Sequence, residues 1–267
     1  MRLLPSLSVV LALMAGPLGA HEFWISPEDY TVDPGEKIKA ELRVGQDFKG
    51  PGYAYIPENF KRFELWAGDE QVAVEGLIGD RPALATAAPQ DGLVTVVHQT
   101  RDYLLTYKDW ETFGLFVTHK DVAWALDRHI ERGFTKDVVK ERYSRYAKSL
   151  VAVGDGAGAD QEVGLLTEIV ALANPYTDDL PDGLPVRVLL DGEPRADVQV
   201  EVYARAPDDT LTITKYRTDA EGVAIVEVSP GTEYLVDSVV LQEIEPEAES
   251  DPVWESLWAS LTFRMPD

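Results

Sequence analysis

The chain has 267 residues, no cysteine, and 47 acidic against 24 basic residues, which give a net charge of −23. This acidity disfavours nucleic acid as a partner, because a polyanion would be repelled rather than attracted. Without cysteine the chain has no disulfides or thiolate metal sites, which leaves nitrogen and oxygen ligands suited to Ni(II), Co(II), Cu(II) or Zn(II).

Residues 1–20 have the pattern of a secretory signal peptide. Arg2 is followed by an apolar stretch from Leu3 to Ala15, and small residues precede a cleavage point after Ala20. We therefore expect the mature chain to begin in the periplasm at His21. We expect no transmembrane anchor after cleavage, because no later segment has the roughly 20 apolar residues that a spanning helix needs.

Residues 21–164 are predicted to form a β-rich N-terminal domain. Residues 37–44 alternate between apolar and charged side chains, which is typical of a half-buried strand. Residues 63–74 consist of two apolar runs joined by a Gly68-Asp69 turn, and this pattern predicts a hairpin. A β-sandwich-like domain follows from these elements.

A helical insertion is predicted near residues 118–142, where the period of the apolar positions changes. Thr118 is expected to cap a helix that Gly133 ends, and a second short helix is expected from Lys136 to Arg142. Residues 144–153 fit both periods. We predict a strand there, because β-branched residues gather at its end and a glycine follows.

Residues 165–267 are predicted to form a C-terminal domain, after the turn-rich stretch 154–160. Short strands separated by turn signals are expected at 186–190, 198–203, 210–216, 223–228, 234–241 and 257–263. This spacing favours an immunoglobulin-like or transthyretin-like sandwich. The predicted fold class is mainly β, with two β-sandwich-like domains, the first of which carries the short helical insertion.

His21 is the first candidate metal ligand. At a new N-terminus its α-amine and its ring Nδ1 can close a chelate ring on one divalent ion, which an internal histidine cannot do. The α-amine releases its proton near neutral pH, so a metal displaces that proton readily. The alternative is that His21 is only the polar first residue of an edge strand.

His98 and His119 are the candidate companions of His21. His98 lies on a predicted strand, on the same face as Val94 and Val96, where it is either a second ligand or a core histidine that bonds to a carbonyl. His119 belongs to the first turn of the predicted helix, where it is either a ligand or simply exposed. The candidate metal ligands are therefore His21, His98 and His119.

Arg142, Arg145 and Lys148 form a basic cluster in an acidic chain. Guanidinium groups match carboxylates, so this cluster is a candidate site for an anionic chelator that carries the metal. The alternative is that these side chains form ordinary ion pairs with the acidic excess.

The usual signatures of hydrolases, zinc peptidases and phosphate-binding loops are missing, and no cysteine nucleophile exists. Their absence argues against an enzyme of these classes.

The chain resembles the family called domain of unknown function 4198, often described as the periplasmic component of ABC-type cobalt or nickel transport. The matching stretches span nearly all of the mature chain: His21 to Ile25, Val44 to Phe48, Lys140 to Lys148, Glu168 to Val170, Asn174 to Tyr176, Thr218 to Gly222 and Trp254 to Phe263. The resemblance implies an exported two-domain β protein linked with cobalt or nickel uptake.

From these observations we expect a periplasmic protein that captures Ni(II) or Co(II), free or chelated, and presents it to an inner-membrane transporter component. One alternative is a histidine-brace enzyme, in which His21 and His98 hold copper and activate oxygen. Another is an extracytoplasmic binding or adhesion module.

Overall fold

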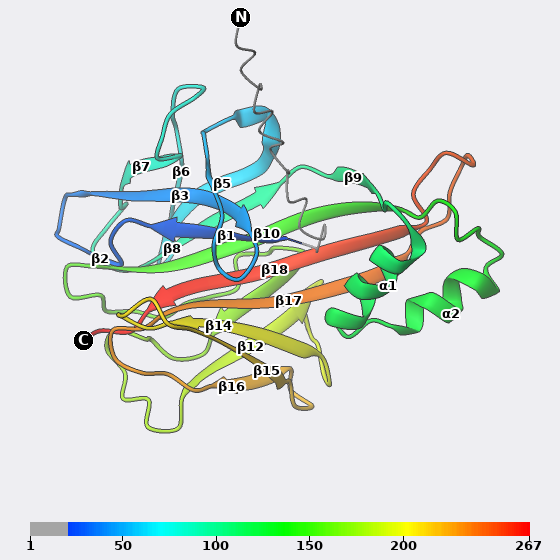
Figure 1. The fold of residues 1–267 in the computed structure, drawn as a ribbon. Helices are drawn as coiled ribbons and strands as arrows, with labels where there is room; N and C mark the ends of the chain where they lie inside the picture. The colour runs from blue at the N-terminus through cyan, green and yellow to red at the C-terminus, as the bar shows by residue number, and fades with distance from the viewer. Residues whose placement is uncertain (1–20) are drawn as a thin grey trace, which may run out of the picture.

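The computed structural model describes residues 21–267, and the predicted signal peptide lies outside these described residues. Residues 21–267 form three sheets, one with ten strands and two with four strands each, and Figure 1 shows their arrangement. The path through the large sheet is β15-β14-β17-β18-β10-β8-β5-β6, and β2 and β9 also pair with β10.

The strands of the large sheet are β2 (Thr31–Val32), β5 (Phe60–Ala67), β6 (Glu70–Ala73), β8 (Gly92–Thr100), β9 (Tyr103–Thr106), β10 (Lys140–Val153), β14 (Gln199–Arg205), β15 (Leu211–Arg217), β17 (Glu233–Glu243) and β18 (Trp254–Arg264). The first small sheet contains β1 (Glu22–Pro27), β3 (Lys37–Gly45), β4 (Gly52–Tyr53) and β7 (Leu84–Ala87). The second contains β11 (Thr167–Ala171), β12 (Leu184–Leu190), β13 (Glu193–Pro194) and β16 (Val223–Val226).

Strand β10 connects the two halves of the chain. It pairs in parallel with β18, from Glu141 beside Trp254 to Ser149 beside Thr262. It also pairs antiparallel with β9 and with β8. Strands from both sides of residue 164 therefore lie in one continuous sheet, and the domain boundary drawn there stays a prediction.

The two small sheets cover opposite faces of the large sheet. Because side chains alternate along a strand, Ala147 and Val151 of β10 join the core beneath the first small sheet, while Leu150 joins the core beneath the second. Each half is thus a sandwich, and the two sandwiches share their middle layer. The prediction of a mainly β chain with two sandwich-like parts is confirmed, with 48% strand and 9% helix.

Most predicted strands are confirmed, because their apolar residues repeat with the period of a sheet. β3 covers the alternating segment 37–44, and its even-numbered residues Ile38, Ala40 and Leu42 are buried. The predicted hairpin is β5 and β6, and Gly68 at its turn has a φ of 54°. Glycine adopts this left-handed conformation without the steric cost that other residues meet.

The helical insertion is shorter than predicted and begins earlier. Helix α1 (Trp110–His119) starts where the side chain of Asp109 accepts a hydrogen bond from the Thr112 backbone N–H, at 2.7 Å. Helix α2 (Trp124–Glu131) ends before Gly133, as predicted. The cap at Thr118 is wrong, because Thr118 already lies in the last turn of α1.

The helix predicted from Lys136 to Arg142 is also wrong. No helix covers these residues, and β10 begins at Lys140. Its side chains alternate between two packed faces, and pairing with β9 and β18 supplies the backbone hydrogen bonds that a helix would have made internally. The strand predicted at residues 144–153 is confirmed and is longer than expected.

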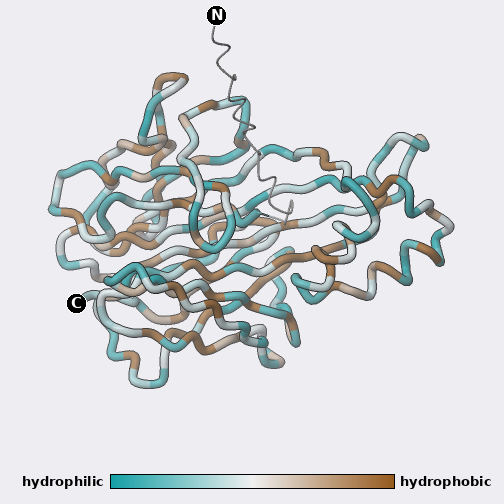
Figure 2. The backbone as a smooth tube through the Cα atoms, in the orientation of Figure 1, coloured by the Kyte–Doolittle hydropathy of each residue, from teal (hydrophilic) through white to brown (hydrophobic). Residues whose placement is uncertain are grey.

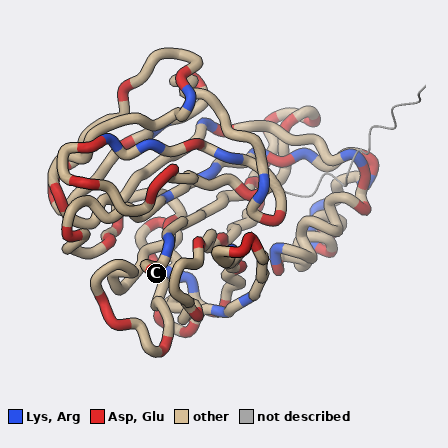
Figure 3. The backbone as a smooth tube through the Cα atoms, turned by 60° about the vertical axis from the view of Figure 1, so that its left-hand side comes forward, with Lys and Arg blue, Asp and Glu red and all other residues tan. Residues whose placement is uncertain are grey.

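Hydrophobic stretches follow the strands between the sheets (Figure 2), and acidic residues are spread over the loops and the rim (Figure 3). A 3-10 turn, η1 (Pro57–Asn59), precedes β5. Within residues 21–267, neither α1 nor α2 has the length and apolar character needed to cross a membrane.

Candidate functional site

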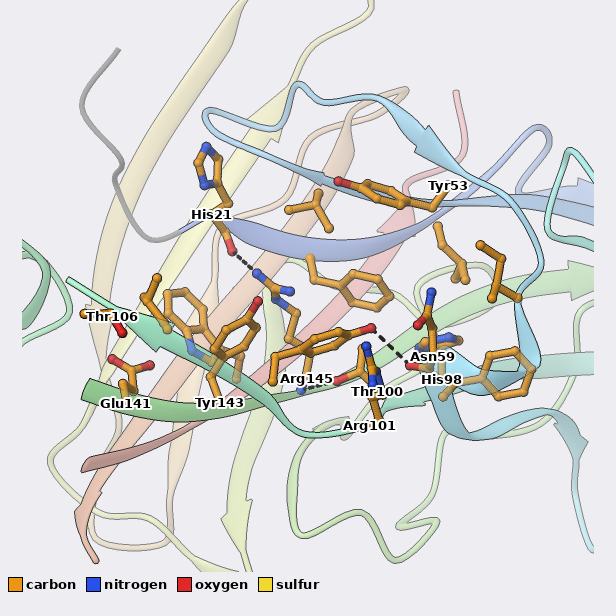
Figure 4. Close-up of a pocket in the computed structure, with 18 of the residues that line it drawn as sticks. His21, Tyr53, Asn59, His98, Thr100, Arg101, Thr106, Glu141, Tyr143 and Arg145 are labelled. Carbon is orange, nitrogen blue, oxygen red and sulfur yellow. Dashed lines mark hydrogen bonds between the residues drawn. The ribbon is translucent and has the colours of Figure 1, made fainter. Parts of the chain in front are cut away.

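A cavity of about 570 Å³ lies between the first small sheet and the large sheet (Figure 4). Residues of β1 and β3 form one wall, and residues of β8, β9 and β10 form the other. The aromatic side chains that line the cavity, from these and from neighbouring elements, are Phe23, Tyr53, Phe60, Tyr103, Tyr107, Tyr143 and Trp258. Walls of this kind suit a small ligand with an apolar or planar body, positioned by a few polar groups.

Arg145 is a cation in this cavity that has no carboxylate partner among residues 21–267. Its Nη2 donates a 3.3 Å hydrogen bond to the His21 carbonyl oxygen, and its Nε is buried without any hydrogen-bond partner. The guanidinium carbon lies 4.7 Å from the centre of the Tyr143 ring. A guanidinium in this state favours a carboxylate or another anion as ligand, because such a group satisfies its remaining donors.

Glu141 is a buried carboxyl group that also lines the cavity. The Tyr107 hydroxyl donates to its Oε2 and the Ser256 hydroxyl donates to its Oε1. The Trp258 indole N–H in turn donates to the Ser256 oxygen at 2.8 Å. Burial raises the pKa of Glu141 to about 7, although the hydrogen bonds from Ser256 and Tyr107 and the charge of Arg145 oppose this shift. The group therefore changes charge near neutral pH.

His98 lies on the predicted face of its strand, in an aromatic enclosure. Its ring centre is 5.1 Å from that of Phe23, 5.4 Å from that of Phe60 and 5.0 Å from that of Phe63. Burial lowers the pKa of His98 to about 3, so the imidazole is neutral at physiological pH. Its Nδ1 is buried and has no hydrogen-bond partner.

His21 lies at the cavity wall, half-buried, directly before the edge strand β1. Its carbonyl oxygen accepts the hydrogen bond from Arg145. Figure 4 shows the His21 ring pointing away from His98 and from the other labelled side chains. Both predicted ligands thus line one cavity, but the His21 side chain would have to rotate before the two imidazoles could hold a single ion.

His119 belongs to a different part of the molecule. Its Nε2 lies 3.0 Å from a carboxylate oxygen of Glu201, and its side chain is half exposed. Glu201 is part of a buried ion cluster in which Lys120 Nζ lies 3.2 Å from Glu22, 2.8 Å from Glu201 and 2.9 Å from Asp237. His119 therefore extends an ion cluster that joins β1 to α1 and the C-terminal strands, and it does not line the cavity.

The carboxyl groups of this cluster respond differently to burial. Burial opposes ionisation of Glu201, yet hydrogen bonds from His119 and Lys120, with the Lys120 charge, hold its pKa at about 2. Burial dominates at Asp237 and raises its pKa to about 6, against the nearby Lys120 charge. The Lys120 ammonium group lies between these carboxyl groups, at the position that a metal cation would need. Within the described part of the chain, no three histidine, aspartate or glutamate side chains converge on a metal position.

Arg142 and Lys148 lie away from the cavity, although Arg145 stands between them in the sequence. Arg142 Nε pairs with Glu255 at 2.6 Å, and Lys148 Nζ pairs with Asp160 and Glu168, each at 2.9 Å. Even-numbered residues of β10 face one way and odd-numbered residues the other. The three basic side chains therefore do not form one cluster, and only Arg145 lines the cavity.

Glu141 and Tyr143 are site residues that the sequence analysis missed. With Arg145 they alternate along the cavity face of β10. The alternation of residues 141 to 145 is the sequence feature that could have identified these two residues. The helix expected at residues 136–142 ruled out a strand there, so the alternation was not used.

The fold and the cavity together describe a mainly β protein of two fused sandwiches with a ligand-sized cavity in the first. The chain belongs to the family described as Domain of unknown function (DUF4198), whose model matches residues 18–242. None of the curated proteins compared with the chain matches it. A solved structure of the D0-D1 domain of intimin is similar at 13% sequence identity and a TM-score of 0.23, over 91% of this chain and 98% of that one.

Proposed function

We propose that the protein is exported to the periplasm, where it captures nickel or cobalt as an anionic chelate in the cavity and presents it to an inner-membrane uptake system. The observation that carries the proposal is the Arg145 guanidinium, which is partly buried among aromatic rings and lacks a carboxylate partner among residues 21–267. This cation lies in a chain with a net charge of −23. It favours a ligand that brings its own negative charge.

Capture of a chelate has more support than capture of a free ion. A free divalent ion needs several protein ligands, and no such group converges within residues 21–267. A chelate brings most of its ligands with it, so the protein need only recognise the chelator and supply one or two donors. In this proposal His21, which lines the cavity, completes the coordination through its ring and, after cleavage, its α-amine.

The test compares two arginines on opposite faces of one strand. Replacing Arg145 with Gln should weaken binding of the Ni(II)–citrate complex at least tenfold by calorimetry, because the chelator carboxylates lose their guanidinium partner. Replacing Arg142 with Gln is the matched control, since Arg142 already pairs with Glu255 outside the cavity, and it should leave the affinity unchanged. Equal affinities in all three proteins would refute the proposed site.

A further inference from the structure

Two groups of opposite charge lie on the cavity face of β10, separated by one aromatic ring. Glu141, Tyr143 and Arg145 occupy alternate positions, so all three line the cavity. With a rise of about 3.3 Å per residue, the first and last Cα atoms are roughly 13 Å apart. The Tyr143 ring stacks on Tyr103 with ring centres 5.4 Å apart, which makes a flat surface between the two charges.

The surroundings of Glu141 stabilise its charge only in part. Its hydrogen-bond donors are the hydroxyls of Tyr107 and Ser256, and no Lys, Arg or His of residues 21–267 pairs with it. The titratable or charged groups nearby are Tyr107 before α1, Tyr143 and Arg145 on its own strand, and Lys108 at the cavity wall. β18 contributes only the neutral Ser256 and Trp258 on this side. Each carboxylate oxygen keeps a free lone pair for a further donor.

We propose that Glu141 is a second recognition group of the cavity, which accepts hydrogen bonds from N–H groups of the bound chelate, so that the preferred chelators are amino acids rather than polycarboxylates. This inference rests on the proposed function, in which Arg145 holds a carboxylate of the same ligand. An amino-acid chelate offers both groups, a carboxylate for Arg145 and metal-bound amine N–H donors for Glu141.

A polycarboxylate chelate meets Glu141 with the wrong charge. Its outer surface consists of oxygens that carry negative charge, and like charges repel strongly in a buried, water-poor site. Protonation of Glu141 removes this repulsion and adds an O–H donor. Discrimination against polycarboxylates should therefore be greatest when Glu141 is ionised, above the pKa of about 7 that burial gives it.

The experiment measures the affinities of the Ni(II) complexes of L-histidine and of citrate by calorimetry, with excess chelator, at pH 8 and at pH 6.5. The wild-type protein should bind the histidine complex at least tenfold more tightly than the citrate complex at pH 8. This ratio should fall at least threefold at pH 6.5. In Glu141→Gln, whose side chain is neutral at both pH values, the ratio should be small and should not change with pH.

The outcomes separate this inference from the proposed function. If both complexes bind the wild-type protein through Arg145, but with equal affinity, or if Glu141→Gln keeps the wild-type ratio, the inference is wrong and the proposed function stands. If neither complex binds the wild-type protein, both are wrong. Should Glu141→Gln fail to fold, as judged by circular dichroism, the pH comparison on the wild-type protein decides the matter by itself.

Discussion

The two faces of β10 use basic side chains in opposite ways. The face of β10 that does not line the cavity is called the closed face here. On the closed face Lys148 is fully buried, and its ammonium group contacts Asp160, Glu168 and a backbone carbonyl. Its charge and its N–H donors therefore all have partners. On the cavity face Arg145 has one long hydrogen bond and no carboxylate partner among the described residues. Both side chains belong to one strand, three residues apart.

Under the proposed function, this difference separates a structural cation from a cation that binds the ligand. Burying a charge is costly unless it is paired, so the Lys148 site is complete and has nothing left to offer a ligand. Arg145 lies beside a cavity large enough for a small ligand. An anionic ligand can supply the carboxylate partner that Arg145 lacks among the described residues. Substitutions on one face of β10 at a time test whether the two faces differ in this way.

The largest effect is expected for Lys148→Met on the closed face. The substitution keeps the length of the side chain but leaves Asp160 and Glu168 buried without their cation. The free energy of unfolding should fall by about 3–5 kcal/mol, as for other broken buried ion pairs. Urea unfolding checks this, with Lys37→Met at an exposed position of β3 as the control. A loss below 1 kcal/mol would show that the closed face does not depend on this pair.

The next effect concerns His98 on the cavity side and depends on pH. Its pKa of about 3 in the folded protein lies below the ordinary value of 6.5, so the unfolded chain binds more protons between these values. Stability from the neutral imidazole is therefore present above pH 6.5 and is lost as pH falls. Between pH 6.5 and pH 5 the titration of His98 alone should lower the free energy of unfolding by about 2 kcal/mol.

His98→Phe should remove that pH dependence, because phenylalanine carries no proton. From pH 6.5 to pH 5 the free energy of unfolding of the variant should therefore rise by about 2 kcal/mol relative to that of the wild-type protein. Urea unfolding at each pH measures this difference. The substitution Gln99→Leu at the next, non-titratable position should leave the pH dependence unchanged. A variant that loses stability in acid as steeply as the wild-type protein would contradict a neutral His98.

A third prediction concerns His21 at the entrance of the cavity. One alanine placed before His21 in the mature chain keeps the imidazole but moves the free amine away, so the chelate ring through amine and Nδ1 cannot close. Affinity for the nickel chelate should drop at least tenfold, about 1.4 kcal/mol. Intact mass must first establish that the mature chain begins at His21. Unchanged affinity of the extended protein would make His21 a structural residue.

The smallest effects are expected for the stability of the two arginine variants. Arg142→Gln removes a partly exposed ion pair, and Arg145→Gln removes one long hydrogen bond and a contact with Tyr143. Each should lower the free energy of unfolding by less than about 1 kcal/mol in urea. A loss of chelate binding in Arg145→Gln then reports on recognition, whereas a large loss of stability would assign Arg145 to the fold.

Most strands were predictable because sheets repeat with a period of two. The segment 37–44 shows that period without exception, and β3 covers it. The segment from Lys136 to Arg142 is different, because its charged residues fit a helix as well as a strand, and the helix that they predict does not form. Pairing with β9 and β18, which lie far away in the sequence, decided for a strand.

The sequence was enough to predict the mainly β class, the short strands and the face on which His98 lies, because these depend on local periodicity. It also determined that any metal ligands would be nitrogen and oxygen atoms. Only the tertiary structure decided which charges are paired. Glu255 reaches Arg142, and Asp160 and Glu168 reach Lys148, by register and packing across the sheets, while no carboxylate of residues 21–267 reaches Arg145. Ion-pair partners depend on how whole strands are arranged in space. A local sequence pattern contains no information about that arrangement.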